Sequence, residues 1–229
     1  PGVTSRSMSR RMTRSESPLF TVLPMPRALR SCFVFFMLLV AAAAYAAPQK
    51  SILVVGDSLS AAYGIAQSRG WVALLAERLK RERPDYSVVN ASVSGDTTAG
   101  GRARLKAALE RHQPAVVIIG LGGNDGLRGL PVAQMKDNLS AMVREARAAG
   151  ARVLLVGMKI PPNYGPDYAG AFAAVFPEVA KAHKAALVPF FLEGFAEDPK
   201  MFQDDRIHPT EAAQPLMLER IWKALRPIL

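Results

Sequence analysis

SILVVGDSLSAAYG, residues 51–64, begins as a buried strand and breaks off at a glycine, an aspartate and a serine. The consecutive apolar residues at 52–55 are typical of a strand covered on both faces. An open α/β sheet places its reactive groups just beyond the carboxyl end of such a strand. Ordinary turns also contain serine, so Ser58 by itself is not decisive. The function therefore depends on what the rest of the chain brings to the same edge.

The remainder of the chain alternates short β-branched runs with longer amphipathic segments. The runs predict strands at 52–55, 87–90, 115–120, 152–157 and 186–190. The amphipathic segments predict helices at 71–83, 98–111, 132–149, 168–183 and 212–225. Apolar strands separated by helices indicate a parallel sheet covered on both faces, so we expect a three-layer α/β/α sandwich. No linker, repeat or low-complexity stretch interrupts residues 48–229, which we expect to form a single domain.

The formal charge of +10 over 229 residues suggests an anionic partner, but its distribution argues against one. Residues 1–47 hold six of the arginines and only one acid, Glu16, so residues 48–229 carry +5. No block of lysine and arginine with interleaved aromatics remains there, so we expect no nucleic-acid partner.

The amino-terminal segment reads as a secretory signal peptide. Met25, a plausible start, opens a positively charged stretch, Cys32 begins a hydrophobic run that ends at Ala44, and Ala44-Tyr45-Ala46 is a small-residue cleavage site. A membrane anchor is the alternative, but a span needs roughly 20 apolar residues and this run is shorter. We expect cleavage near Ala46 or Ala47 and a location outside the cytoplasm, either periplasmic or secreted. Residues 1–24 are an upstream extension of unassigned role.

Cys32 is the only cysteine of the chain and lies in this segment. The mature protein therefore has no disulfide, no thiol nucleophile and no cysteine-bound zinc. Arg30 interrupts the pattern of a lipoprotein site, so we expect a soluble product without a stable membrane anchor.

A serine nucleophile needs a base within hydrogen-bond reach and a carboxylate to orient that base. His112 and His183 stand at the ends of predicted helices, where a cation is favoured for structural reasons. His208 instead lies on a loop at the carboxyl edge, three residues after Asp205. This spacing alone is as typical of a solvated turn as of a catalytic pair.

Acyl transfer also needs donors aimed at the developing oxyanion. Gly95 follows the second strand and has no Cβ, so its N–H can approach a substrate closely, and Asn124 follows the third strand and offers a side-chain amide. Each has an ordinary interpretation as a turn residue. The shared sheet edge of Ser58, Gly95, Asn124 and His208 favours the catalytic interpretation.

Four blocks together closely resemble the signature blocks of the SGNH (GDSL) hydrolases, namely GDSLS, NASVSGDT, GGND and DRIHP. The order of the blocks and their places after the strands match as well, over about residues 50–228. The segments GGNDGLRG at 122–129 and PPNYG at 161–165 are most similar to the bacterial periplasmic thioesterase I, lysophospholipase and arylesterase group. The resemblance implies a flavodoxin-like sheet of five parallel strands in the order 2-1-3-4-5, with no metal and no organic cofactor.

The resemblance also implies roles for individual residues. It makes Ser58 the nucleophile, His208 the general base and Asp205 its orienting acid. The N–H groups of Ser58 and Gly95 and the amide of Asn124 would form the oxyanion hole. Asp57 resembles the family's structural aspartate, which holds the turn.

Two further segments resemble the family's substrate groove. The loop Gly126–Leu130, with Leu127 and Leu130, is similar to a mobile loop that closes over acyl chains, and Lys159–Tyr164, with Lys159, Ile160 and Tyr164, would line the groove. Relatives usually carry arginine and leucine where this chain has Lys159 and Ile160. The resemblance therefore does not fix the preferred chain length.

We expect a serine esterase that acts on acyl esters and thioesters, including aryl esters and lysophospholipids, and that works as a monomer. An α/β-hydrolase is disfavoured because the chain has no G-x-S-x-G elbow, and nucleotide binding because it has neither G-x-G-x-x-G nor a Walker loop. A carbohydrate O-deacetylase on the same fold is the alternative, although Leu127, Leu130, Ile160 and Phe172 favour an apolar groove. A catalytically silent binding protein of the envelope is a further alternative, disfavoured because each essential group is present.

Overall fold

The computed structural model of the chain describes Gly2 and residues 49–229, and the latter contain a five-stranded sheet. The predicted signal segment, with Met25, Cys32 and Ala46, lies outside these residues. None of the described helices is both long enough and apolar enough to cross a bilayer.

The strands are all parallel and follow the order β2-β1-β3-β4-β5, which confirms the predicted topology. Their bounds are β1 Lys50–Gly56, β2 Tyr86–Asn90, β3 Val116–Gly120, β4 Arg152–Val156 and β5 Ala186–Val188. β1 pairs with β2 on one side and with β3 on the other, so the first strand lies inside the sheet. The strand order reverses at β1, and open α/β sheets bind ligands outside the carboxyl ends of the strands at such a point.

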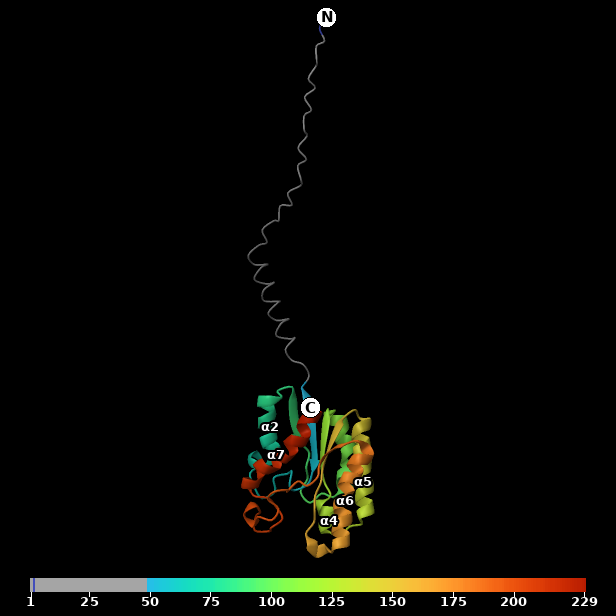
Figure 1. Ribbon diagram of the computed structural model, residues 1–229, viewed down its shortest axis with the longest axis vertical. Helices are drawn as coiled ribbons and strands as arrows, with labels where there is room; N and C mark the ends of the chain where they lie inside the picture. The colour runs from blue at the N-terminus through green and yellow to red at the C-terminus, as the bar shows by residue number, and fades with distance from the viewer. Residues whose placement is uncertain (1, 3–48) are drawn as a thin grey trace. The chain divides into compact units, whose positions relative to one another are not determined.

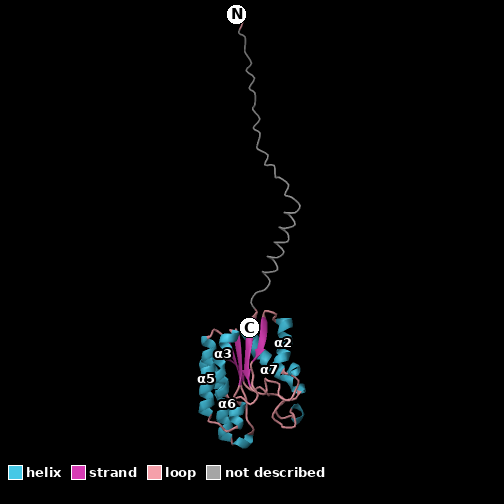
Figure 2. Ribbon diagram, turned by 180° about the vertical axis from the view of Figure 1, so that it is seen from behind, coloured by secondary structure: helices cyan, strands magenta, loops and turns pink. Residues whose placement is uncertain are grey.

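Alternate residues of each buried strand point to opposite faces and create two cores. Ile52 and Val54 face one core and Leu53 and Val55 face the other, and none of these four is exposed to solvent. The helices α2 Trp71–Glu82 and α7 Gln214–Leu225 cover the first face. The second face is covered by α3 Thr98–His112, α5 Val132–Ala148 and α6 Pro166–His183. Figures 1 and 2 show the strands between these two layers of helices, so the predicted sandwich is confirmed.

The predicted elements agree with the structure to within a few residues, with two informative differences. The last strand ends at Val188 instead of residue 190, because Pro189 has no N–H to donate to a ladder. A five-residue helix, α4 Gly123–Leu127, occupies what the sequence predicts as a loop after β3. Both differences lie at the carboxyl edge of the sheet, where the functional residues gather.

Candidate active site

Ser58 lies on a tight turn directly after β1. The carbonyl of Asp57 accepts hydrogen bonds from the N–H groups of Ser60 and Ala61, at 3.2 and 2.9 Å, and a carboxylate oxygen of Asp57 accepts one from the N–H of Leu59 at 3.0 Å. Gly56 precedes the turn because there is no room for a side chain: a Cβ there would lie 2.6 Å from the Ser60 hydroxyl oxygen. The strand therefore ends where the turn folds back over it.

Ser58, His208 and Asp205 form a continuous chain of hydrogen bonds. His208 Nε2 lies 2.9 Å from Ser58 Oγ, and His208 Nδ1 lies 2.6 Å from Asp205 Oδ2. The other carboxylate oxygen of Asp205 accepts the N–H groups of Ile207 and His208, each at 2.9 Å. Backbone N–H groups thus hold the carboxylate of Asp205 in place. The carboxylate orients the imidazole so that Nε2 faces Ser58.

The pKa of Asp205 is lowered to about 2. Partial desolvation is the largest single influence and acts in the opposite direction, but it is outweighed by the backbone N–H and side chain of His208 and the backbone N–H of Ile207. Asp205 is therefore ionised at neutral pH, as an acid that stabilises an imidazolium must be. The neighbouring Asp204 is exposed.

Gly95 lies on the loop after β2 and Asn124 lies in α4, both at the carboxyl edge of the sheet. Gly95 has a φ of +79°, which disfavours a side chain, and its carbonyl accepts a hydrogen bond from Arg128 at 2.9 Å. The amide nitrogen of Asn124 donates to the carbonyl of Asp96 at 2.9 Å and lies 3.4 Å from a carboxylate oxygen of Asp57. The structure thus brings both predicted donors to the edge where Ser58 lies.

Asp57 is buried directly beneath this edge, with 5 % of its surface exposed. Desolvation raises its pKa to about 6, and the N–H of Leu59 and the nearby His208 reduce the shift. A carboxyl group in this state sits between its protonated and ionised forms in mildly acidic solution.

Arg104 on α3 joins the loops that follow the first two strands. Its guanidinium binds the carboxylate of Asp96 at 2.7 Å and the carbonyl of Gly56 at 3.2 Å, and it also donates to the carbonyl of Ala91. These contacts hold the roots of the Ser58 and Gly95 loops at a fixed separation.

Of the predicted groove residues, Lys159 is exposed and the others are buried or partly buried. Ile160 is 9 % exposed and packs beneath α4, where a Cβ on Gly126 would lie 2.6 Å from it. Leu127 and Leu130 are half-buried.

The backbone of the Gly126–Leu130 loop is held by two tyrosines. Tyr164 donates its hydroxyl to the carbonyl of Leu127 at 2.9 Å, and Tyr168 donates to that of Leu130 at 2.7 Å. Lys159 lies over the ring of Phe190, 4.9 Å from its centre. The predicted Lys159 and Tyr164 thus pack against neighbouring residues.

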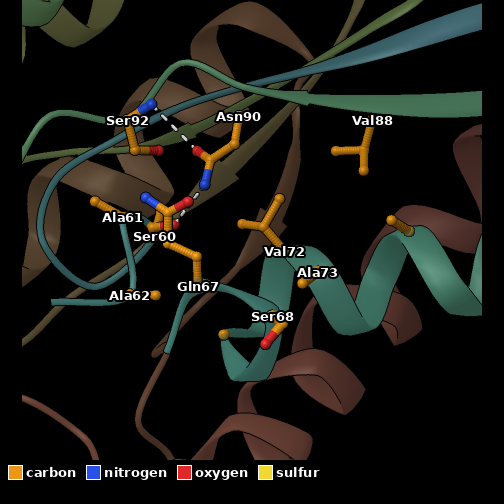
Figure 3. A pocket seen from close by; sticks show the side chains of 12 residues that line it. Ser60, Ala61, Ala62, Gln67, Ser68, Val72, Ala73, Val88, Asn90 and Ser92 are labelled. Carbon is orange, nitrogen blue, oxygen red and sulfur yellow. Dashed lines mark hydrogen bonds between the residues drawn. The ribbon is translucent and has the colours of Figure 1, made fainter. Parts of the chain in front are cut away.

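A wide cleft of about 410 Å³ lies behind the nucleophile turn, between α2 and the end of β2 (Figure 3). Neither Ser58 nor His208 lines it, and its lining holds no titratable side chain. Asn90 bridges its walls by donating to the carbonyl of Ser60 at 2.7 Å and accepting the N–H of Ser92 at 3.1 Å (Figure 3). We assign this cleft no part in the chemistry, which requires the groups at the sheet edge.

The remaining histidines lie at the opposite edge of the sheet. His112 is the last residue of α3, and its carbonyl accepts the hydroxyl of Ser51 at 3.0 Å. His183 is the last residue of α6, and its carbonyl accepts a hydrogen bond from Arg147. Within residues 49–229, no group of three or more His, Cys, Asp or Glu side chains is arranged to hold a metal ion.

Comparison with known proteins identifies the class to which this arrangement belongs. Residues 54–215 match the GDSL-like Lipase/Acylhydrolase family, which is more than half of the chain. The chain therefore belongs to this family and is an ester hydrolase of the GDSL type.

Three curated relatives are similar over nearly their whole lengths. Esterase TesA of Pseudomonas aeruginosa is 55% identical over 201 residues, which cover 88% of this chain and 98% of that protein. Thioesterase 1/protease 1/lysophospholipase L1 of Escherichia coli is 43% identical over 197 residues, with 86% and 92% covered. Arylesterase of Vibrio mimicus is 40% identical over 197 residues, with 86% and 96% covered. A crystal structure of TesA superimposes with a TM-score of 0.77 at 58% identity, covering 79% of this chain and all of that one.

Proposed function

We propose that the chain hydrolyses acyl esters and thioesters through an acyl-enzyme formed on Ser58. The observation that carries this proposal is the hydrogen-bond chain from Ser58 Oγ through His208 to Asp205, with distances of 2.9 and 2.6 Å. A hydroxyl becomes a useful nucleophile when a base accepts its proton and a carboxylate stabilises the resulting cation.

The reaction proceeds in two halves. Ser58 Oγ attacks the carbonyl carbon while its proton passes to His208 Nε2, and the bond to the leaving oxygen or sulfur then breaks as Nε2 returns that proton to it. In the second half, water gives a proton to the same nitrogen and attacks the acyl-enzyme. The carboxylic acid leaves and Ser58 recovers its proton, so no external co-reactant besides water is needed.

The negative charge on the carbonyl oxygen would be held by the N–H groups of Ser58 and Gly95 and by the amide of Asn124. The contact of Asn124 with Asp57 is long at 3.4 Å, so a substrate oxygen can replace it at little cost. The stronger bond to the carbonyl of Asp96 keeps the amide in place meanwhile. Donors positioned before the reaction need no reorganisation in the transition state.

The substrates we propose are aryl esters, acyl thioesters and lysophospholipids. The relatives named esterase, thioesterase, lysophospholipase and arylesterase support this range. We also propose that the protein acts as a monomer without a metal or organic cofactor, because the three side chains supply the nucleophile, the base and the orienting charge.

The test combines covalent labelling with one substitution. An organophosphonate should label one residue, Ser58, and Ser58→Ala should abolish hydrolysis of phenyl acetate, an acyl thioester and a lysophospholipid while leaving the thermal unfolding transition intact. Removing a member of such a triad typically costs several orders of magnitude in turnover. Stoichiometric labelling at any other residue, or hydrolysis retained by the variant, contradicts the proposal. Acetylated sugars hydrolysed faster than all three substrates would favour the deacetylase instead.

We further propose that the protein is exported to the periplasm or secreted, since Ala44-Tyr45-Ala46 follows the hydrophobic run. Amino-terminal sequencing of exported protein should begin near Ala46 or Ala47. Retention of Cys32 in the exported product would contradict this proposal.

A further inference from the structure

Exposed large apolar side chains are concentrated at the catalytic edge. Among residues 49–229, the most exposed are Tyr63, Val93, Ile207 and Leu216, at 52, 50, 47 and 42%. The first three lie on the loops that carry Ser58, Gly95 and His208, and Leu216 lies on α7. Single exposed apolar residues are ordinary on protein surfaces, but three of the four on the loops around a reactive centre point to an apolar ligand there.

Tyr63 is the aromatic member of this set, and its ring packs against the imidazole of His208. Its ring centre lies 4.4 Å from that of His208, with the two ring planes tilted by 38°. The contact covers one part of the tyrosine, while half of the side chain remains in solvent. An aromatic surface is thus held beside the base and left available to a further group.

The backbone of Tyr63 is fixed from both sides. Its N–H donates to the carbonyl of Ser58 at 3.1 Å, and its carbonyl accepts a hydrogen bond from the Gln203 side chain at 2.9 Å. Gly64 follows with a φ of +73°, and a Cβ there would lie 2.0 Å from the Gln203 amide oxygen. The nucleophile turn and the loop before His208 therefore determine together where the Tyr63 ring lies.

The reaction defines which part of the substrate meets this ring. His208 Nε2 must return its proton to the leaving oxygen, so the leaving group has to lie beside the imidazole. The acyl carbonyl is directed the other way, towards Gly95 and Asn124. Tyr63 is exposed and packs against His208, and the exposed Ile207 precedes His208 in the chain, so apolar surface is available near the leaving group.

We propose that Tyr63 is a specificity-determining residue that contacts the leaving group and selects planar aromatic alcohols over small alkyl ones. This inference rests on the proposed function and deepens it by assigning the alcohol side of the ester. Aromatic rings in offset or tilted contact attract each other beyond the area that they bury, whereas a small alkyl group gains little from the ring. The acyl side is left to other residues.

The test compares two esters with the same acyl group, phenyl acetate and ethyl acetate, in Tyr63→Ala. The ratio of kcat/KM for phenyl over ethyl acetate should fall roughly tenfold relative to wild type, the scale of one aromatic pair with its buried area. This ratio does not depend on the fraction of active enzyme, so partial misfolding of the variant does not affect it. Tyr63→Phe should retain the wild-type ratio, and Leu216→Ala, which removes an exposed apolar side chain on α7, should leave it unchanged.

The two esters form the same acetyl-enzyme, so deacylation separates contact with the leaving group from support of the base. Breakdown of the acetyl-enzyme should proceed at the wild-type rate in Tyr63→Ala. Equal losses for both esters together with slower deacylation would mean that Tyr63 only braces His208, and an unchanged ratio would mean that the ring meets no leaving group. Either result overturns the inference while Ser58 remains essential, whereas activity retained by Ser58→Ala would overturn the proposed function.

Discussion

The two carboxylate oxygens of Asp205 have different partners. One oxygen accepts the backbone N–H groups of Ile207 and His208, and the other lies 2.6 Å from the imidazole. The three-residue spacing brings these groups together within one turn. Asp204 has the same chemistry, but its carboxylate makes none of these three contacts.

Asp205→Asn and Asp204→Asn should therefore differ sharply. Loss of the orienting charge at Asp205 should lower kcat on the order of 10²- to 10⁴-fold, because the imidazole loses its fixed tautomer and the partner of its cation. Asp204→Asn should keep most of the activity. Turnover of phenyl acetate by the two purified variants measures the difference, and similar losses, or a larger loss for Asp204→Asn, would reassign the orienting acid.

Asp57 should make the stability of the fold depend on pH. Its folded-state pKa of about 6 lies above the ordinary value of 3.8, so the folded protein holds the proton more tightly than the unfolded chain. The resulting stabilisation is fully present below about pH 4, is lost as the pH rises to about 6, and amounts to about 3 kcal/mol.

Asp57→Asn tests this linkage because asparagine does not titrate. Between about pH 4 and about pH 6, the free energy of unfolding of the wild type should fall relative to that of the variant, and above this range the two should run in parallel. Urea unfolding across this range measures the difference. Curves that stay parallel throughout would show that Asp57 titrates equally in the folded and unfolded chains.

At the scale of elements, α4 and the loop after it depend on contacts that lie outside them. The hydroxyls of Tyr164 and Tyr168 donate to carbonyls of Leu127 and Leu130, and Arg128 donates to that of Gly95. The family resemblance predicts a mobile loop here, so any motion has to break these hydrogen bonds first.

Tyr164→Phe and Tyr168→Phe should each lower the free energy of unfolding by about 1 kcal/mol, the net value of one hydrogen bond. Together they should speed amide hydrogen exchange within residues 126–130. Tyr86→Phe is the matched control, because it removes a hydroxyl that donates to the carbonyl of Leu229 at 2.9 Å at the opposite edge. Exchange in this loop that responds equally to the control would rule out a specific restraint by the two tyrosines.

The sequence predicts the five strands because each strand is a continuous apolar run between helical patterns, and the family resemblance implies their order. It does not predict α4, since the segment GNDGL contains two glycines, an asparagine and an aspartate, all poor helix formers. Tertiary contacts stabilise α4 instead: the carboxylate of Asp125 accepts the backbone N–H of Thr98 at 2.9 Å and its hydroxyl at 2.5 Å. These partners are 27 residues apart, beyond the reach of a local pattern.

At the scale of the whole molecule, contacts between residues far apart in the sequence explain which site residues the sequence does not reveal. Ser58, Gly95, Asn124 and His208 lie in short blocks at strand ends, and the structure brings them to one edge. Tyr63 lies three residues beyond the GDSLS block, and no pattern in the sequence marks it as functional. Its importance arises from contacts with Gln203 and His208, about 140 residues further along the chain, which only the folded structure brings together.

The separation of 150 residues between Ser58 and His208 also places the two in order of time. At about 5–20 residues per second, a ribosome makes the serine on the order of ten seconds before its base. A nascent chain that has already completed β1 is therefore inert, and hydrolysis begins only when the carboxyl-terminal loop has been made and has docked beside that strand. The appearance of esterase activity should accordingly mark the last step of biosynthesis and folding. A chain truncated before residue 205 should show no esterase activity, however well its sheet has formed.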